Sequence, residues 1–157
     1  MVKVTLLQLG KTHFSFVNDG FVEFSKRLTH YCKFENKIFE LPTKLKSKDI
    51  FQTKKAEAEI ILKQLKPTDF VILLDENGKT YNSIQLANYI ENLSIQQSSL
   101  VFIIGGAYGF DDTIYNRANA KLSISAFTFS HQLIRLIFIE QLYRCFTIIK
   151  GEPYHHQ

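Results

Sequence analysis

The sequence predicts an α/β protein in which a mostly parallel sheet is covered by helices on both of its faces. Two observations lead to this prediction. First, strand-like and helix-like segments alternate along the whole chain. Second, the apolar runs within residues 70–78 and 98–109 have no polar face and lead into glycine-containing turns. Central parallel strands have this character when helices cover both sides of the sheet.

Hydrophobic periodicity and turn residues define the individual elements. Strands are predicted at residues 2–9, 33–41, 70–78, in the apolar part of 98–109, and at 122–125. Helices are predicted at 15–31, 50–66, 82–92, 113–119, and from Ser130 to about residue 149. Side chains suited to N-caps precede three of these helices, namely Asn82 or Ser83, Asp111 or Asp112, and Ser130. Pro67 and Gly151 are the predicted stops of the second and last helices.

Length and composition are those of one globular domain covering residues 1–157. The net charge of +4 is compatible with a polyanionic partner but does not require one. No apolar run is long enough to span a bilayer, and the first residues do not resemble a signal peptide, so a cytoplasmic protein is expected. Cys32 and Cys145 are far apart and are predicted to be free buried thiols, and no metal site is expected.

Three predicted strands end in segments suited to ligand binding. These segments are Leu74 to Lys79, Ile104 to Gly109, and Ile124 to His131. In open parallel sheets, ligands bind outside the carboxyl ends of the strands. Glycines at 105, 106 and 109 would let backbone approach a cofactor closely, although a tight strand-to-helix turn explains them equally well. Their GGxxG spacing matches neither the dinucleotide fingerprint nor the P-loop.

The last predicted helix is apolar on nearly all sides, which predicts that part of it lies in a subunit interface. Its polar exceptions form two pairs at i, i+4 spacing, His131 with Arg135 and Glu140 with Arg144. For the second pair, a structural ion pair is the favoured explanation. For His131, it remains open that this histidine lies at the start of a helix and has no functional role. Tyr154 and His155 follow in a tail that either frays or contributes ring stacking and proton transfer.

Several strings together show a family resemblance over essentially the whole chain. They are LLDENGK, FIIGGAYGF and a C-terminal set made of L-S-x-S-x-x-T-F, H-Q-L-x-R, E-Q-L-Y-R and P-Y-H. With these strings the chain resembles the small SPOUT methyltransferases, which methylate N3 of a pseudouridine in large-subunit ribosomal RNA. The resemblance implies a C-terminal trefoil knot, although general topology rules argue against knots. It also implies a homodimer with the site near its interface.

The same resemblance implies S-adenosyl-L-methionine (SAM) as cofactor and 23S rRNA, within assembled large subunits or 70S ribosomes, as substrate. The residues implied to bind SAM are Leu74, Gly105, Gly106, Ile124, Ser125, Ala126, Phe127, Thr128 and Phe129. Direct methyl transfer needs no protein nucleophile or metal, so the protein mainly positions the reactants. His131, Tyr154 and His155 are the candidates for proton handling or base placement, without a single general base being chosen. Arg135 and Arg144 are candidates for holding phosphate or carbonyl oxygens.

Three positions depart from the family pattern. Members often carry Pro at the position of Ser130, and Arg at the positions of His156 and Asn77. Ser130 is compatible with helix capping, whereas His156 cannot supply a permanent cation, and contacts made by the loop around Asn77 are put in doubt. Two other functions stay open from the residues alone. One is a non-catalytic module that binds the ribosome, and the other is a flavodoxin-like nucleotide-binding enzyme.

Overall fold

A computed structural model describes residues 1–46 and 48–156. Its sheet has five strands in the order β2-β1-β4-β3-β5, and every neighbouring pair is parallel. The strands are β1 (Lys3–Leu9), β2 (Lys33–Phe39), β3 (Phe70–Thr80), β4 (Ser99–Ile104) and β5 (Ala120–Ser123). The α/β prediction is therefore confirmed, and the described sheet is parallel throughout.

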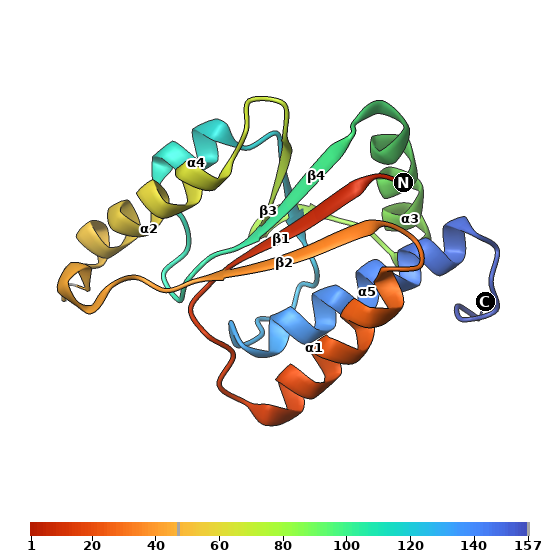
Figure 1. Ribbon diagram of the computed structural model, residues 1–157, viewed down its shortest axis with the longest axis horizontal. Helices are drawn as coiled ribbons and strands as arrows, with labels where there is room; N and C mark the ends of the chain where they lie inside the picture. The colour runs from red at the N-terminus through yellow and green to blue at the C-terminus, as the bar shows by residue number, and fades with distance from the viewer. Residues whose placement is uncertain (47, 157) are drawn as a thin grey trace.

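Helices cover both faces of this sheet, as predicted. They are α1 (Ser15–Leu28), α2 (Ile50–Gln64), α3 (Ser83–Gln96), α4 (Asp112–Arg117) and α5 (Leu133–Ile149), with a short 3-10 turn at Thr43–Leu45. One apolar core joins the sheet to α1, α3 and α5, and a second joins its other face to α2 and α4. Figure 1 shows α1 and α5 side by side below the sheet, with α2 and α4 on the opposite side.

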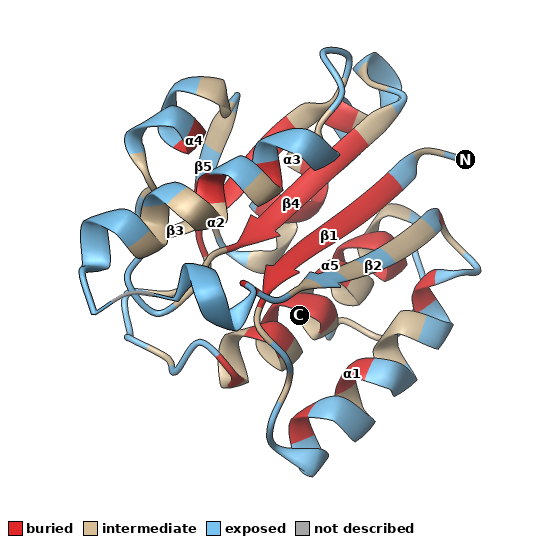
Figure 2. Ribbon diagram, turned by 60° about the vertical axis from the view of Figure 1, so that its left-hand side comes forward, coloured by how far each residue is buried: buried red, intermediate tan, exposed pale blue. Residues whose placement is uncertain are grey.

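Alternating side chains of the central strands fill the two cores. In β1, Val4 and Leu6 belong to the α1–α5 side, whereas Leu7 and Leu9 belong to the α2–α4 side. Figure 2 shows β1 and β4 as the most completely buried strands, because each has a strand on either side and helices above and below. Fully burying one such aliphatic side chain contributes roughly 1.5–3 kcal/mol.

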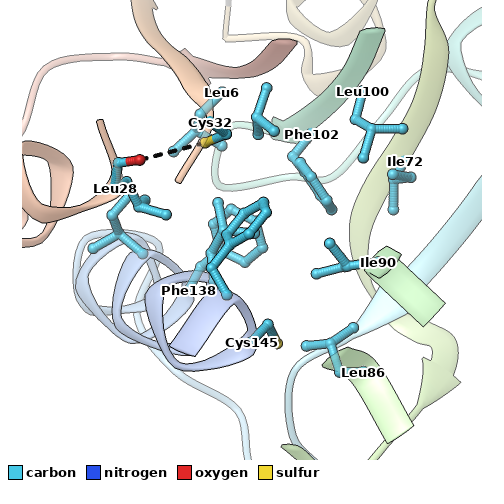
Figure 3. Close-up of a cluster of buried hydrophobic side chains, with 14 of the residues drawn as sticks. Leu6, Leu28, Cys32, Ile72, Leu86, Ile90, Leu100, Phe102, Phe138 and Cys145 are labelled. Carbon is cyan, nitrogen blue, oxygen red and sulfur yellow. Dashed lines mark hydrogen bonds between the residues drawn. The ribbon is translucent and has the colours of Figure 1, made fainter. Parts of the chain in front are cut away.

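The larger core gathers around α5. The ring of Phe138 on α5 lies 5.0 Å from that of Phe102 on β4, measured between centroids. Both predicted free cysteines are buried in this cluster (Figure 3), and the Cys32 thiol contacts the Leu28 carbonyl oxygen at 3.7 Å. Burial raises the pKa of both thiols to about 12, so they stay protonated at neutral pH. The prediction of free buried thiols is confirmed.

Several element boundaries shift by a few residues from those predicted, and two of these shifts concern the loop between β5 and α5. Strand β5 ends at Ser123 rather than at residue 125. Its last hydroxyl donates to the Ser125 carbonyl oxygen at 3.1 Å, and the Ser125 hydroxyl accepts from the Phe127 amide at 3.0 Å. Such local side-chain bonds compete with the strand ladder. Helix α5 begins at Leu133 with Gln132 at its N-cap position, although the Ser130 hydroxyl still accepts from the Leu133 amide at 3.1 Å.

The other predicted caps agree with the structure. Asn82 forms a capping box with Gln85 at the start of α3, and Asp111 rather than Asp112 caps α4. Gly151 ends α5 with a φ of 68°, a value that favours glycine. Within the part of the chain that the structure describes, no helix is long and apolar enough to cross a membrane.

Candidate functional site

A cavity of about 500 Å³ opens at the carboxyl edge of the sheet, where β3, β4 and β5 end. The three segments singled out from the sequence meet there. Eight of the nine residues implied to bind a cofactor line it, namely Leu74, Gly105, Gly106, Ile124, Ser125, Phe127, Thr128 and Phe129, and His131 lines it as well. The ninth, Ala126, is exposed in the same loop and is absent from the cavity wall. A small side chain at a loop tip explains this difference.

The glycines after β4 are needed for packing. A Cβ atom on Gly105 would lie 2.9 Å from the ring of Phe110, and one on Gly106 would lie 2.8 Å from the Glu57 carboxylate on α2. Gly106 and Gly109 also pair across a tight turn in which Gly109 has a φ of 81°. The tight-turn explanation is therefore correct. The same compact turn brings the loop backbone to the cavity, so the two explanations are compatible.

The loop after β5 forms the outer wall of the cavity. Its two serine hydroxyl bonds fix the backbone between residues 123 and 127. The Phe127 side chain is 80% exposed although it belongs to the lining. A large apolar ring left in solvent at the rim of a cavity is available to cover a ligand or to contact a partner.

Sequence reasoning missed Tyr115, which lines the cavity. Asp75, Tyr108 and Phe110 also line it, and they lay within the quoted strings without being named as site residues. The Tyr115 hydroxyl on α4 donates to a carboxylate oxygen of Asp75 on β3. Burial first, and then this carboxylate, raise the pKa of Tyr115 to about 12, so it remains a donor at neutral pH. Asp75 was visible within the LLDENGK string. Nothing in the sequence pairs it with a tyrosine 40 positions later.

Arg135 does not reach the cavity or the solvent. Its side chain is 0% exposed, and its guanidinium donates to the Leu9 carbonyl oxygen at 2.8 Å and to the Thr12 hydroxyl at 3.0 Å. Burial lowers the pKa of this guanidinium. The neighbouring Gln132 bonds to the same β1–α1 loop, donating to the Lys11 carbonyl oxygen and accepting from the His13 amide. Arg135 therefore holds the start of α5 against β1, which corrects the prediction of an RNA contact.

Comparison with known proteins decides the family. A family model described as "Predicted SPOUT methyltransferase" matches residues 2–155 of the chain. The chain belongs to this SPOUT methyltransferase family. A protein of Parabacteroides distasonis named "Ribosomal RNA large subunit methyltransferase H" is 44% identical, over 99% of this chain and 100% of the relative. Relatives with the same name from Christiangramia forsetii (46%, covering 98% and 99%) and Flavobacterium johnsoniae (45%, covering 99% and 100%) match similarly.

A solved structure supports the fold of this methyltransferase. It is titled "The structure of a probable methylase family protein from Haemophilus influenzae Rd KW20" and matches with a TM-score of 0.51. The match covers 99% of this chain and 70% of the other, at 12% sequence identity. At that identity the likeness concerns the fold alone.

The C-terminal tail of this methyltransferase packs against the end of α5. The Arg144 guanidinium donates to the Glu140 carboxylate at 2.7 Å, which confirms the structural ion pair, and it contacts Nδ1 of His155 at 3.2 Å. The Tyr154 hydroxyl donates to the same carboxylate at 3.0 Å, and the guanidinium lies 4.8 Å from the Tyr154 ring centre. The tail is thus held by a defined network. Nε2 of His155 is buried without a partner among the described residues.

One chain does not bring the predicted catalytic residues together. His131 lies at the start of α5 beside the cavity, whereas Tyr154 and His155 follow its end. The tail folds back along α5, so that Tyr154 contacts Glu140 and His155 contacts Arg144. At 1.5 Å per residue these contacts lie roughly 14 and 20 Å along the helix from His131. Among the described residues, no group of three or more side chains is arranged to hold a metal ion.

Proposed function

We propose that this chain transfers a methyl group from SAM to N3 of a pseudouridine in 23S rRNA, within assembled large subunits or 70S ribosomes. The observation that carries the proposal is the cavity at the carboxyl edge of β3, β4 and β5, lined by eight of the nine residues expected to bind SAM. The printed names of three full-length relatives at 44–46% identity support the class of substrate.

The cavity suits a cofactor of the size and chemistry of SAM. Its volume of about 500 Å³ is within the range of small-molecule sites. The Leu74 and Ile124 side chains offer apolar surface, and the backbone around Gly105 and Gly106 can approach the ligand because no side chain intervenes. When bound, SAM supplies a methyl group already activated on a sulfonium. The residues present fit this cofactor.

The protein residues must place the base and manage its N3 proton. His131 is exposed at the cavity, and its imidazole can accept or donate a proton there. Tyr154 and His155 are the other candidates, and the Arg144 cation that contacts them can attract a phosphate or a carbonyl oxygen. We infer that each residue orients the base or accepts its proton, because positioning accounts for most of the acceleration when the cofactor provides the electrophile.

A homodimer resolves the separation between the cavity and the tail. We infer that the tail of one copy completes the cavity of the other, because the two groups are roughly 14–20 Å apart along α5. In a two-fold interface the same patch lies on both subunits, so the beginning of one helix can meet the end of its partner. Several apolar residues of α5 are only partly buried in the single chain, among them Leu133, Ile134 and Ile137.

The trefoil knot belongs to the same proposal. After β5, at one edge of the sheet, the chain crosses β3 and β4 before Gln132 and Arg135 bond to the loop after β1. A crossing of this kind is what a C-terminal knot requires. Pulling the chain from both termini should give an extended length below the roughly 550 Å of an unknotted 157-residue chain. A full-length extension would contradict the knot.

The function is tested by calorimetry with SAM together with methyl transfer to 70S ribosomes, isolated large subunits and naked 23S rRNA. We expect SAM to bind, and assembled particles to be methylated faster than naked RNA, because residues 2–155 all belong to the methyltransferase domain and folded RNA is recognised largely by its shape. Particles carrying uridine instead of pseudouridine at the target are the control. Ribosome binding without SAM binding or methyl transfer would favour the non-catalytic module, and bound flavin would favour the flavodoxin-like enzyme.

A further inference from the structure

A second hollow, of about 260 Å³, lies at the other end of the sheet from the SAM cavity. It is bounded by the amino ends of β1 and β4, the middle of β2 and the segment that follows α2. Lys3 of β1 pairs with Ser99 of β4 at this end, whereas Gln8 pairs with Ile104 close to the SAM cavity. The Lys3 end of the second hollow is about 17 Å along the sheet from Ile104, since strands rise roughly 3.3 Å per residue.

Positive charge dominates the second hollow. The ammonium groups of Lys3 and Lys37 share one carboxylate, that of Glu35, at 3.1 and 3.5 Å. Lys66 also lines the hollow, and its ammonium group has no ion-pair partner in the described part of the chain. The only carboxylate in the described lining is that of Asp69.

The Asp69 carboxylate is already engaged by the protein. One of its oxygens accepts from the Lys66 amide at 2.8 Å, and the other accepts from the Ser99 hydroxyl at 2.8 Å. The Arg117 guanidinium is close behind, donating to the Lys66 carbonyl oxygen at 2.7 Å. The lining therefore holds the three cations Lys3, Lys37 and Lys66 against the carboxylate of Asp69. Glu35, which pairs with two of these lysines, lowers the excess to one positive charge.

A buried hydroxyl adds a donor to these cations. Thr5, which is only 5% exposed, lines the hollow with its hydroxyl-bearing side chain. The hydroxyls of Thr68 and Ser98 lie at the rim. No aromatic side chain is found in the described lining, so the hollow offers no stacking surface for a base. Ammonium and hydroxyl donors without a stacking ring suit a phosphate group.

We propose that this hollow binds a phosphate group of the RNA backbone, as a docking contact at the opposite end of the sheet from the site of methyl transfer. The inference rests on the proposed rRNA substrate. It gives a chain of one small domain a second, sequence-independent contact that fixes its orientation on the ribosomal particle. Phosphate contacts of this kind release counterions, so the affinity that they provide falls steeply with salt.

The test compares K37Q/K66Q with the matched double variant K26Q/K63Q, which removes the same charge from exposed lysines outside the hollow. We expect K37Q/K66Q to weaken binding to ribosomal particles about tenfold at fixed salt, and to reduce the slope of log affinity against log salt by about 2. SAM binding should be unchanged, and K26Q/K63Q should lose less than about threefold. Equal losses in the two variants, or none, would overturn the proposal.

A titration with inorganic phosphate distinguishes a site for RNA phosphate from a site for free small anions. Amide resonances of residues 3–5, 66, 68 and 69 are followed by NMR as phosphate is added to the wild-type chain and to K37Q/K66Q. Phosphate-dependent shifts that the variant loses, together with its weaker ribosome binding, support the proposal. The same shifts with unaltered ribosome binding would overturn it in favour of a small-anion site. A wild-type chain that binds particles but transfers no methyl group would contradict the proposed function. The comparison of particle binding between the two double variants could still be interpreted in that case.

Discussion

Replacing Gly78 with alanine is expected to lower the free energy of unfolding by about 3 kcal/mol and the melting temperature by roughly 10 °C. A Cβ atom at this position would lie 2.7 Å from backbone atoms of Lys121 and Leu122 on β5. Backbone in a strand cannot rotate away as the end of a side chain can. The cost is therefore a displacement of β5 from β3, which thermal and denaturant unfolding would measure.

The position of Gly78 connects this stability effect to the SAM cavity. Leu74 and Lys79 both pair with Leu122, so residues 75–78 leave the strand and return to it. This bulge contributes Asp75 and Asn77 to the cavity wall, and β5 leads directly into the loop of residues 124–129. We expect SAM binding to weaken in G78A as well. The neighbouring Asn77→Ala, at an exposed side chain, should change stability by less than about 0.5 kcal/mol. A melting temperature in G78A equal to that of N77A would contradict the backbone clash.

Local patterns predicted most of the elements but not the bulge in β3. Alternating and apolar runs define strands because side-chain burial follows local periodicity. The return of the chain at Lys79 depends on pairing with β5, more than 40 positions later, and no local pattern encodes it. The glycine of the LLDENGK string indicated that another part of the chain could approach closely. The string did not indicate that this part is β5.

The candidate site shows the same division between local and distant information. The loops at 74, 105 and 124–129 were predicted to meet, because parallel strands bring their carboxyl ends to one edge. The hydrogen bond between Tyr115 and Asp75 and the burial of Arg135 beneath the loop after β1 depend on contacts between distant segments. Helical spacing predicted that His131 and Arg135 lie on one face, but it did not predict how far each side chain is buried. A turn of helix was enough to separate an exposed imidazole from a fully buried guanidinium.

Removing residues 154–157 is expected to slow methyl transfer at least about 100-fold while leaving SAM affinity within a factor of two. Tyr154 and His155 are lost, but both are held beside Glu140 and Arg144, roughly 14–20 Å along α5 from the cavity of the same chain. Calorimetry and single-turnover methylation of ribosomal particles measure the two effects separately. His156→Ala, at an exposed position in the same tail, is the matched control and should retain activity within about threefold. Wild-type activity in the shortened chain would contradict a role for the tail.

Mixing two inactive variants tests whether the tail serves the partner's cavity. The second variant is Thr128→Trp, whose indole would occupy the cavity from an exposed position without entering either core, and calorimetry should show loss of SAM binding. Random exchange makes half of the dimers mixed, and each mixed dimer has one open cavity facing one intact tail. Activity should then return to about a quarter of the wild-type value. If each tail served its own cavity, every cavity in the mixture would lack one component and no activity would return. Since Tyr154 and His155 are held to α5 through Glu140 and Arg144, the restored fraction should fall when Glu140→Gln is added to the variant that supplies the tail.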